Sequence, residues 1–249
     1  MKPSFIVVHV PHASTVIPEP ERSSFRIDLA GELMKMTDRF CDELFCGEDP
    51  SVVFPVSRLV CDPERFRDDA SERMSSVGMG AVYTRTHDGA VLRTVDAETR
   101  ERILKTYYDP HHAALTETVQ SALDRTGRCL LIDGHSFRPQ PLPYEPDQDP
   151  VRPDFCIGTD PFHTPEELKN TSIRFLRSRG YTVSVDSPYS GTLVPMRFYR
   201  KDSRVCSVMI EINRRQYMDA DGNRGARFHM IRGDVQALIG LLRNDGKAR

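Results

Sequence analysis

The chain has 249 residues, enough for one large domain with a sizeable hydrophobic core. Its 34 Lys and Arg residues nearly balance 36 Asp and Glu residues, and the formal net charge of −2 excludes a general nucleic-acid binder, which would show a strong basic excess. No apolar run approaches the length of a membrane-spanning helix, so we expect a soluble protein with neither nucleic-acid nor membrane partners.

Two further features predict a cytoplasmic location. The apolar stretch at residues 5–10 is too short for the core of a secretory signal, and it contains His9. The six cysteines are scattered and form no CxxC pair, which predicts free thiols in a reducing compartment.

Apolar runs and helical patterns alternate along the chain. In order, we expect a strand at residues 5–10, a helix at 28–45 capped by Asp28, a strand at 52–60, a helix at 97–123, a strand at 129–132, a helix at 164–179, a strand at 205–212 and a helix at 228–242. This alternation predicts an α/β sandwich with a largely parallel sheet. Without a repeat or a shift in composition, residues 1–249 are expected to form one domain.

The segment 137–154 is an exception, because its many prolines exclude regular structure. A loop of this length inside a domain is usually a lid or a binding loop. It begins directly after His135 and Ser136.

Polar side chains follow each predicted strand. Ligands of open α/β sheets bind beyond the carboxyl ends of the strands, and the residues found there are His9, His12, Arg58, Asp62, Arg65, Asp133, His135, Glu211, Arg214 and Arg215. We therefore expect histidines, carboxylates and arginines to converge on one rim.

Two imidazoles from different strands suit a catalytic zinc, which takes three N or O ligands and leaves one position open for water. Glu211 is a candidate for the base that takes the proton of that water, although it could instead form a buried ion pair with Arg214 or Arg58. Taken singly, His12 or His135 could be a hydrogen-bonded structural histidine. Arginines on the rim suit a substrate carboxylate.

Other candidates have simpler interpretations. Arg65 and Arg67 stand in a run with Asp68 and Asp69 that also fits a solvated face. The remaining histidines that lack supporting neighbours are expected to be structural, namely His9, His87, His163 and His229.

Six motifs in order resemble the N-formylglutamate amidohydrolase family, from about residue 5 to about residue 219. They are Val10-Pro11-His12-Ala13-Ser14 with Ile17-Pro18, Thr37-Asp38-Arg39-Phe40, Ser57-Arg58 with Asp62 and Arg65, Tyr108-Asp109-Pro110-His111-His112, Leu131-Ile132-Asp133-Gly134-His135-Ser136, and Ile210-Glu211-Ile212-Asn213-Arg214 with Tyr217-Met218. The family is distantly similar to zinc carboxypeptidases and aspartoacylases. The resemblance implies a three-layer α/β/α sandwich with a mostly parallel mixed sheet, of the zinc-carboxypeptidase-like (phosphorylase/hydrolase-like) kind.

The resemblance also implies site residues. His12 and His135 would bind one Zn²⁺, Glu211 would activate water, and Arg58, Arg65 or Arg214 would hold a substrate carboxylate. The carboxypeptidases place an acidic ligand three residues after the first histidine, where this chain has Thr15. We expect Asp38, on the helix after the first strand, to replace it, with Asp133 as the alternative.

Two further features belong to the resemblance. The related group has an Asn before its Arg, where this chain reads Asp62-Pro63-Glu64-Arg65. The segment Ser187-Pro188-Tyr189-Ser190-Gly191 resembles a loop over the substrate, in which Tyr189 could donate a hydrogen bond.

The expected activity is zinc-dependent hydrolysis of a small N-acyl amino acid, with N-formyl-L-glutamate giving formate and L-glutamate as the first choice. The family name suggests amino-acid metabolism, in particular histidine degradation. The alternatives are a related metallo-amidohydrolase or carboxypeptidase acting on another N-acyl amino acid or a short peptide, and a metal-free binding protein on the same scaffold. The sequence does not determine the oligomeric state.

Overall fold

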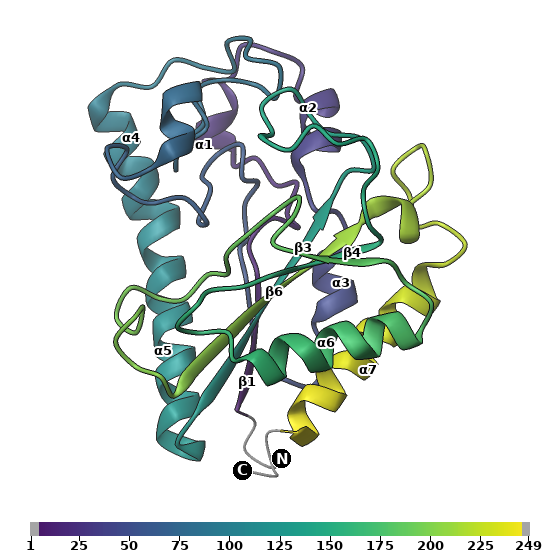
Figure 1. Cartoon of the computed structure of the whole chain (residues 1–249). Coiled ribbons are helices and arrows are strands. Elements are labelled where there is room, and N and C mark those ends of the chain that lie inside the picture. The colour runs from purple at the N-terminus through teal and green to yellow at the C-terminus, as the bar shows by residue number, and fades with distance from the viewer. Residues whose placement is uncertain (1–4, 246–249) are drawn as a thin grey trace.

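A six-stranded sheet runs through the molecule, with helices on both faces (Figure 1). The computed structural model describes residues 5–245. The strand order is β2-β1-β3-β6-β4-β5, and the bounds are β1 Ile6–Val10, β2 Ser51–Val53, β3 Cys129–Phe137, β4 Phe155–Gly158, β5 Val183–Val185 and β6 Val205–Asn213. Within these residues only the β4–β6 pair is antiparallel. The mostly parallel mixed sheet is confirmed.

The helices divide between the two faces of the sheet. On one face lie α3 (Cys41–Phe45), α6 (Glu166–Ser178) and α7 (Phe228–Asp245), and on the other lies α5 (Asp109–Thr126). A π-helical segment, Leu104–Tyr108, joins α5 to α4 (Ala97–Ile103). Two short helices, α1 (Glu19–Arg22) and α2 (Leu29–Met36), and two 3-10 turns, Arg73–Val77 and Arg214–Gln216, complete the structure.

Each central strand alternates between the two faces. In β1, Ile6, Val8 and Val10 pack against α3 and α7, whereas Val7 packs on the α5 side together with Leu131 of β3. Burying each such side chain contributes about 1.5–3 kcal/mol. Because strand side chains repeat with a period of two, β1 and β3 also direct polar residues at defined positions onto the α5 face.

The helix expected over residues 28–45 is instead two helices. Asp28 caps α2 as expected, with its side chain accepting the N–H of Ala30. The helix then ends at Met36, the next residue is extended, and Phe40 adopts a left-handed conformation (φ 68°) before α3 begins. The apolar spacing did not reveal this break between the two helices, because the apolar positions keep the same helical phase before and after the break. Asp38 therefore lies in a turn and not on a helix.

Strand lengths also differ from expectation. The strand expected over residues 52–60 is short, because Pro55 has no N–H to extend the ladder with β1. The strand expected over 129–132 continues to Phe137 through Asp133 and His135, since these polar residues find partners inside the protein. The strands β4 and β5 were not anticipated.

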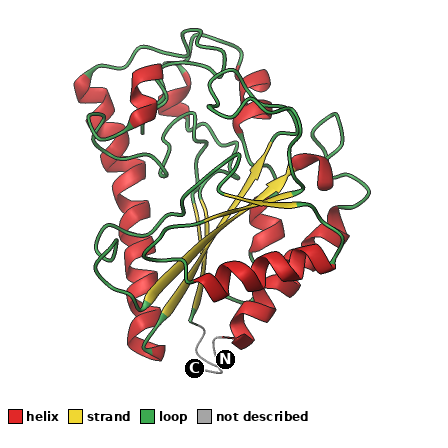
Figure 2. Cartoon of the chain, viewed as in Figure 1, coloured by secondary structure: helices red, strands yellow, loops and turns green. Residues whose placement is uncertain are grey.

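Loops and short helices gather beyond the arrowheads of the strands (Figure 2). They have a core of their own, which includes Phe54, Leu59, Tyr83 and Leu104. Buried Arg93 ties three of their segments together by donating to the backbone carbonyls of Leu59, Val60 and Tyr83. This region is therefore a packed layer over the carboxyl ends of the strands. Among the described residues, no helix has the length and apolar character needed to cross a bilayer.

Candidate active site

His12 and His135 meet at the carboxyl ends of β1 and β3. His12 follows β1 by two residues, and His135 lies inside β3. The chain passes from β1 to β2 on one side and places β3 on the other, which is the topological switch where open α/β sheets bind ligands. The two ring centroids lie 5.1 Å apart, close enough for both imidazoles to reach one ion.

Carboxylates set the direction of both imidazoles. Nε2 of His12 lies 2.9 Å from Oδ1 of Asp62. Nε2 of His135 lies 3.2 Å from Oδ1 of Asp133 and 3.3 Å from Oε2 of Glu64. Because an ionised carboxylate only accepts, each Nε2 carries a hydrogen, and Nδ1 is the ring nitrogen that is left to bind an ion.

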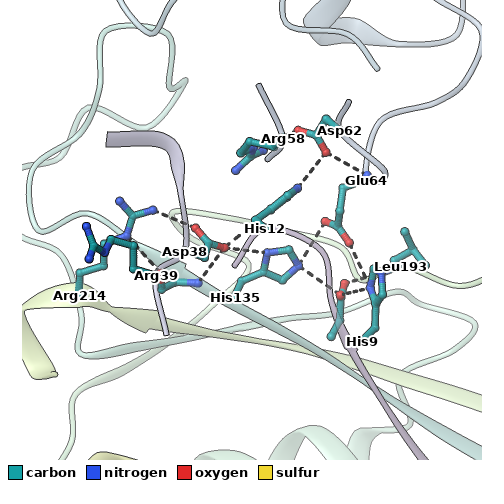
Figure 3. A network of polar contacts seen from close by, with 12 residues as sticks. His9, His12, Asp38, Arg39, Arg58, Asp62, Glu64, His135, Leu193 and Arg214 are labelled. Carbon is teal, nitrogen blue, oxygen red and sulfur yellow. Dashed lines mark hydrogen bonds and ion pairs between the residues drawn. The ribbon is translucent and has the colours of Figure 1, made fainter. Parts of the chain in front are cut away.

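Asp38 faces the Nδ1 atoms of both imidazoles (Figure 3). Its Oδ2 lies 3.7 Å from Nδ1 of His12 and 3.4 Å from Nδ1 of His135. The turn after α2 brings it there, since the N–H of Asp38 donates to the carbonyl of His12 (2.9 Å). Its other oxygen accepts a hydrogen bond from Arg214 (2.9 Å).

The donor set fits a tetrahedral cation. Zinc bonds of about 2.0–2.1 Å place neighbouring ligand atoms about 3.3 Å apart, which is close to the two N···O distances of Asp38. Nδ1 of His12 is buried without a hydrogen-bond partner among the described residues. His12, Asp38 and His135 are each at least 97% buried, so a cation there would be shielded from solvent.

Asp133, the alternative third ligand, contacts the opposite edge of His135. It accepts from Nε2 of His135 and from Nδ1 of His9 (2.8 Å), while its Oδ2 accepts the N–H of Leu193. It therefore orients His135. His9 is not isolated, as the sequence suggested, because Nε2 of its ring also bonds to His111 at 2.9 Å.

Glu211 lies directly across the ladder from His135, on the same face of the sheet. Its side chain is 6% exposed, and Oε2 has no hydrogen-bond partner among the described residues. Burial raises the pKa of Glu211 to about 8, and Asp38 and Glu64 add to this effect against the opposing charge of His135. Glu211 forms no ion pair with Arg214 or Arg58 among these residues, so its carboxyl group is available to a ligand.

The three predicted arginines reach the same cavity but have different partners. Arg58 binds Asp62 (2.7 Å), and Arg214 donates to Asp38, to Ser136 and to the carbonyl of Lys35. Nε of Arg65 is buried 3.7 Å from Asp62 and has no hydrogen-bond partner among residues 5–245. Burial opposes the charge of Asp62, but Arg58 and the His12 imidazole outweigh it and hold its pKa well below the usual range.

A cavity of about 280 Å³ unites these groups. Its walls include the three proposed ligands His12, Asp38 and His135, together with Glu211 and Tyr189. The proline-rich segment after His135 forms another wall, as expected of a binding loop, through Arg138, Leu142, Tyr144, Glu145 and Pro146.

Sequence reasoning missed Glu64, Lys35 and Arg138, which also line the cavity. Glu64 stands next to Arg65, inside a motif already singled out, and could have been collected with it. Lys35 carried no signal, because tertiary contacts alone bring its segment to the site. Arg138 stands next to the predicted strand-end motif and could have been collected with it.

A buried polar cavity at the carboxyl ends of a parallel sheet is the arrangement in which α/β enzymes convert small molecules, and the fold and the site define this class. Residues 4–218 match the model of the protein family described as "N-formylglutamate amidohydrolase". The chain belongs to the N-formylglutamate amidohydrolase family, a family of hydrolases.

Two solved structures are similar to this chain. The crystal structure of N-formylglutamate amidohydrolase from Ralstonia eutropha is 25% identical, with a TM-score of 0.85, covering 99% of this chain and 96% of that chain. A gene product from Agrobacterium tumefaciens shares the fold, at 17% identity and a TM-score of 0.66, covering 96% of this chain and 92% of that chain. No curated protein matches the sequence.

Proposed function

We propose that the protein is a zinc-dependent amidohydrolase that converts N-formyl-L-glutamate to formate and L-glutamate. One observation carries the zinc dependence: one ring nitrogen each of His12 and His135 and a carboxylate oxygen of Asp38 lie within 4.8 Å of one another. Family membership and the similarity to the Ralstonia eutropha enzyme support the reaction and its substrate.

In this proposal His12, Asp38 and His135 hold a single Zn²⁺. Bound zinc supplies Lewis acidity toward an amide carbonyl and lowers the pKa of water. Asp62, Asp133 and Glu64 keep the two imidazoles in the ligating orientation through their Nε2 atoms.

Glu211 is the proton carrier. Its carboxylate takes a proton from the water that attacks the formyl carbon, and then delivers this proton to the amine nitrogen as the carbon–nitrogen bond breaks. Burial raises the pKa of Glu211 toward neutrality, which supports a group that must both accept and donate a proton. Its position opposite His135 in the ladder and on the wall of the same cavity supports this role.

The arginines have two roles in the proposal. Arg58 and Arg214 hold the carboxylates of Asp62 and Asp38 while contributing positive charge to the substrate carboxylates. Arg65 binds the α-carboxylate, since its buried Nε lacks a hydrogen-bond partner among the described residues. The hydroxyl of Tyr189, on the cavity wall, donates a hydrogen bond to the substrate.

The test combines activity with metal content. Protein purified without chelator is analysed for metals and then assayed for formate release from N-formyl-L-glutamate, with N-acetyl-L-glutamate and a glutamyl dipeptide as competitors. We expect close to one equivalent of zinc and the highest kcat/KM for the formyl substrate. Preference for another substrate would change the substrate assignment, and less than about a tenth of an equivalent of zinc would contradict the metal site.

A further inference from the structure

The cationic side chains of the cavity differ in whether their charge is matched. Lys35, Arg58, Arg65, Arg138 and Arg214 all line it. Arg58 and Arg214 have carboxylates at 2.7 and 2.9 Å, and Arg65 lies 3.7 Å from Asp62. Within residues 5–245, Arg138 and Lys35 have no carboxylate within ion-pair distance. Two positive charges of the cavity are therefore left for a ligand.

Arg138 is the first of these two. Its side chain is half-buried, and its Nε is buried with no hydrogen-bond partner among the described residues. The nearby acid Glu145 is already engaged by Arg152 and by the N–H of Leu142. A buried guanidinium donor without an acceptor is unfavourable, and a carboxylate entering the cavity would satisfy it with the planar, two-donor geometry that arginine offers.

Lys35 is held in place by two residues behind it. Its Nζ lies 2.9 Å from Nε2 of His87, whose Nδ1 lies 2.6 Å from the buried carboxylate of Glu32. The backbone N–H of His87 donates to the other oxygen of Glu32. When Nδ1–H of His87 donates to Glu32, Nε2 of His87 accepts one hydrogen bond from Lys35. The other two N–H donors of Lys35 are then left for a ligand.

Arg214 links the two positions. It donates to the carbonyl of Lys35, and its charge adds to burial in lowering the pKa of Arg138. Arg214 therefore lies near both residues, and all three line the same cavity.

We propose that Arg138 and Lys35 form a subsite for the side-chain carboxylate of an acidic N-acyl amino acid, and that this subsite makes the enzyme selective for dicarboxylates. The inference rests on the proposed function for the identity of the reacting amide. It adds the residues that distinguish glutamate derivatives from neutral analogues of the same size.

Equilibrium binding tests the subsite without turnover. The zinc-loaded protein is titrated by calorimetry with L-glutamate and with L-glutamine, which has the same shape and no side-chain charge. We expect the wild-type protein to bind glutamate about 10- to 100-fold more tightly, the range for hydrogen bonds to a charged group. Arg138→Met should bring this ratio close to 1, and Lys35→Met should lower it several-fold.

Control variants distinguish recognition of the ligand's charge from a general effect on folding. Arg138→Lys keeps a positive charge and should recover part of the ratio, while Arg125→Met, at an exposed position in the last turn of α5, should leave it unchanged. Equal binding of the two ligands by the wild-type protein would overturn the proposal, as would an equal loss of both ligands in Arg138→Met and Lys35→Met.

The outcomes also separate this proposal from the proposed function. A wild-type protein that releases formate equally fast from N-formyl-L-glutamate and N-formyl-L-glutamine is an amidohydrolase without this subsite. A protein that binds glutamate selectively but releases no formate has the subsite without the reaction.

Discussion

His135 and Glu211 are directly opposed in the parallel ladder between β3 and β6. Neighbouring strands lie about 4.8 Å apart, and both side chains point to the same face of the sheet. The proposed metal ligand and the proposed proton carrier therefore share one rigid frame, and neither depends on a mobile loop for its position.

The isosteric change Glu211→Gln removes the proton acceptor and keeps the packing. We expect kcat to fall by at least about a hundredfold, in line with typical general acid–base contributions, while the zinc content stays at the wild-type level. Formate release and elemental analysis on the same preparation check this, with Glu98→Gln on the exposed side of α4 as the control. Wild-type turnover would remove Glu211 from the mechanism.

Asp62 orients His12 and is itself held by Arg58 and Tyr83. Asp62→Asn keeps a hydrogen-bond acceptor but removes the charge behind the imidazole. We expect zinc affinity to weaken by about 10- to 100-fold, the usual effect of losing a carboxylate partner of a metal-binding histidine. Competition with a chelator measures this, and Asp124→Asn on α5 should bind zinc as the wild type does. Unchanged affinity in Asp62→Asn would show that His12 needs no such partner.

Gly134 separates Asp133 from His135 and faces α3. A Cβ at this position would lie 2.7 Å from the ring of Phe45. We expect Gly134→Ala to lower the free energy of unfolding by about 1–3 kcal/mol through overpacking, whereas Gly31→Ala, with open space around it on α2, should not destabilise the protein.

A double-mutant cycle identifies the cause. Phe45→Leu opens space beside Gly134, so the Gly134→Ala change should cost less in the Phe45→Leu background than alone. Denaturant unfolding of the four proteins measures this coupling. Strictly additive losses would mean that the Phe45 ring is not what excludes a side chain at position 134.

Glu21 gives a pH dependence far from the metal site. It is buried and accepts two hydrogen bonds from Arg102, which together with the charge of Arg102 lower its pKa against the opposing effect of burial. A carboxylate with a lowered folded-state pKa stabilises the protein above its unfolded pKa of about 4.3, and this stabilisation is lost as the pH falls through the folded value.

The wild-type protein should therefore exceed Glu21→Gln in stability by about 1 kcal/mol at pH 7, a modest value because Arg102 is half exposed. The difference should shrink as the pH falls below about 4. Urea unfolding at several pH values measures it, with the exposed Glu19→Gln as the control. A difference that does not change with pH would assign the effect to packing.

The sequence predicted those site residues that lie on strands or directly after them. His12, His135 and Glu211 lie at or beyond the ends of apolar strands, and a strand fixes the face on which each side chain emerges. The resemblance predicts Asp38 as a ligand, but the apolar spacing wrongly predicts that it lies on a helix, because this spacing reports helical phase and not the polar contacts that end a helix.

Local sequence patterns could not predict how the residues of loops reach the site. Glu64 is positioned by hydrogen bonds to the backbone on both sides of it, from His112 to Pro63 and from Tyr108 to Arg65. Lys35 depends on His87, which is 52 residues away in the sequence. Contacts at this separation leave no local pattern, so only the folded chain reveals them.

The π-helical segment Leu104–Tyr108 has a consequence for how this chain can vary. A π turn accommodates one residue more than an α turn, and each residue advances a helix by about 100°. Removing one residue from this segment would rotate Tyr108 and His112 relative to α4, and they would no longer face the carbonyls of Arg65 and Pro63. The number of amino acids in one turn thus sets the phase of a long helix, and through it the placement of the backbone at Pro63 and Arg65. A single-codon deletion in this segment should therefore be less well tolerated than a conservative substitution there.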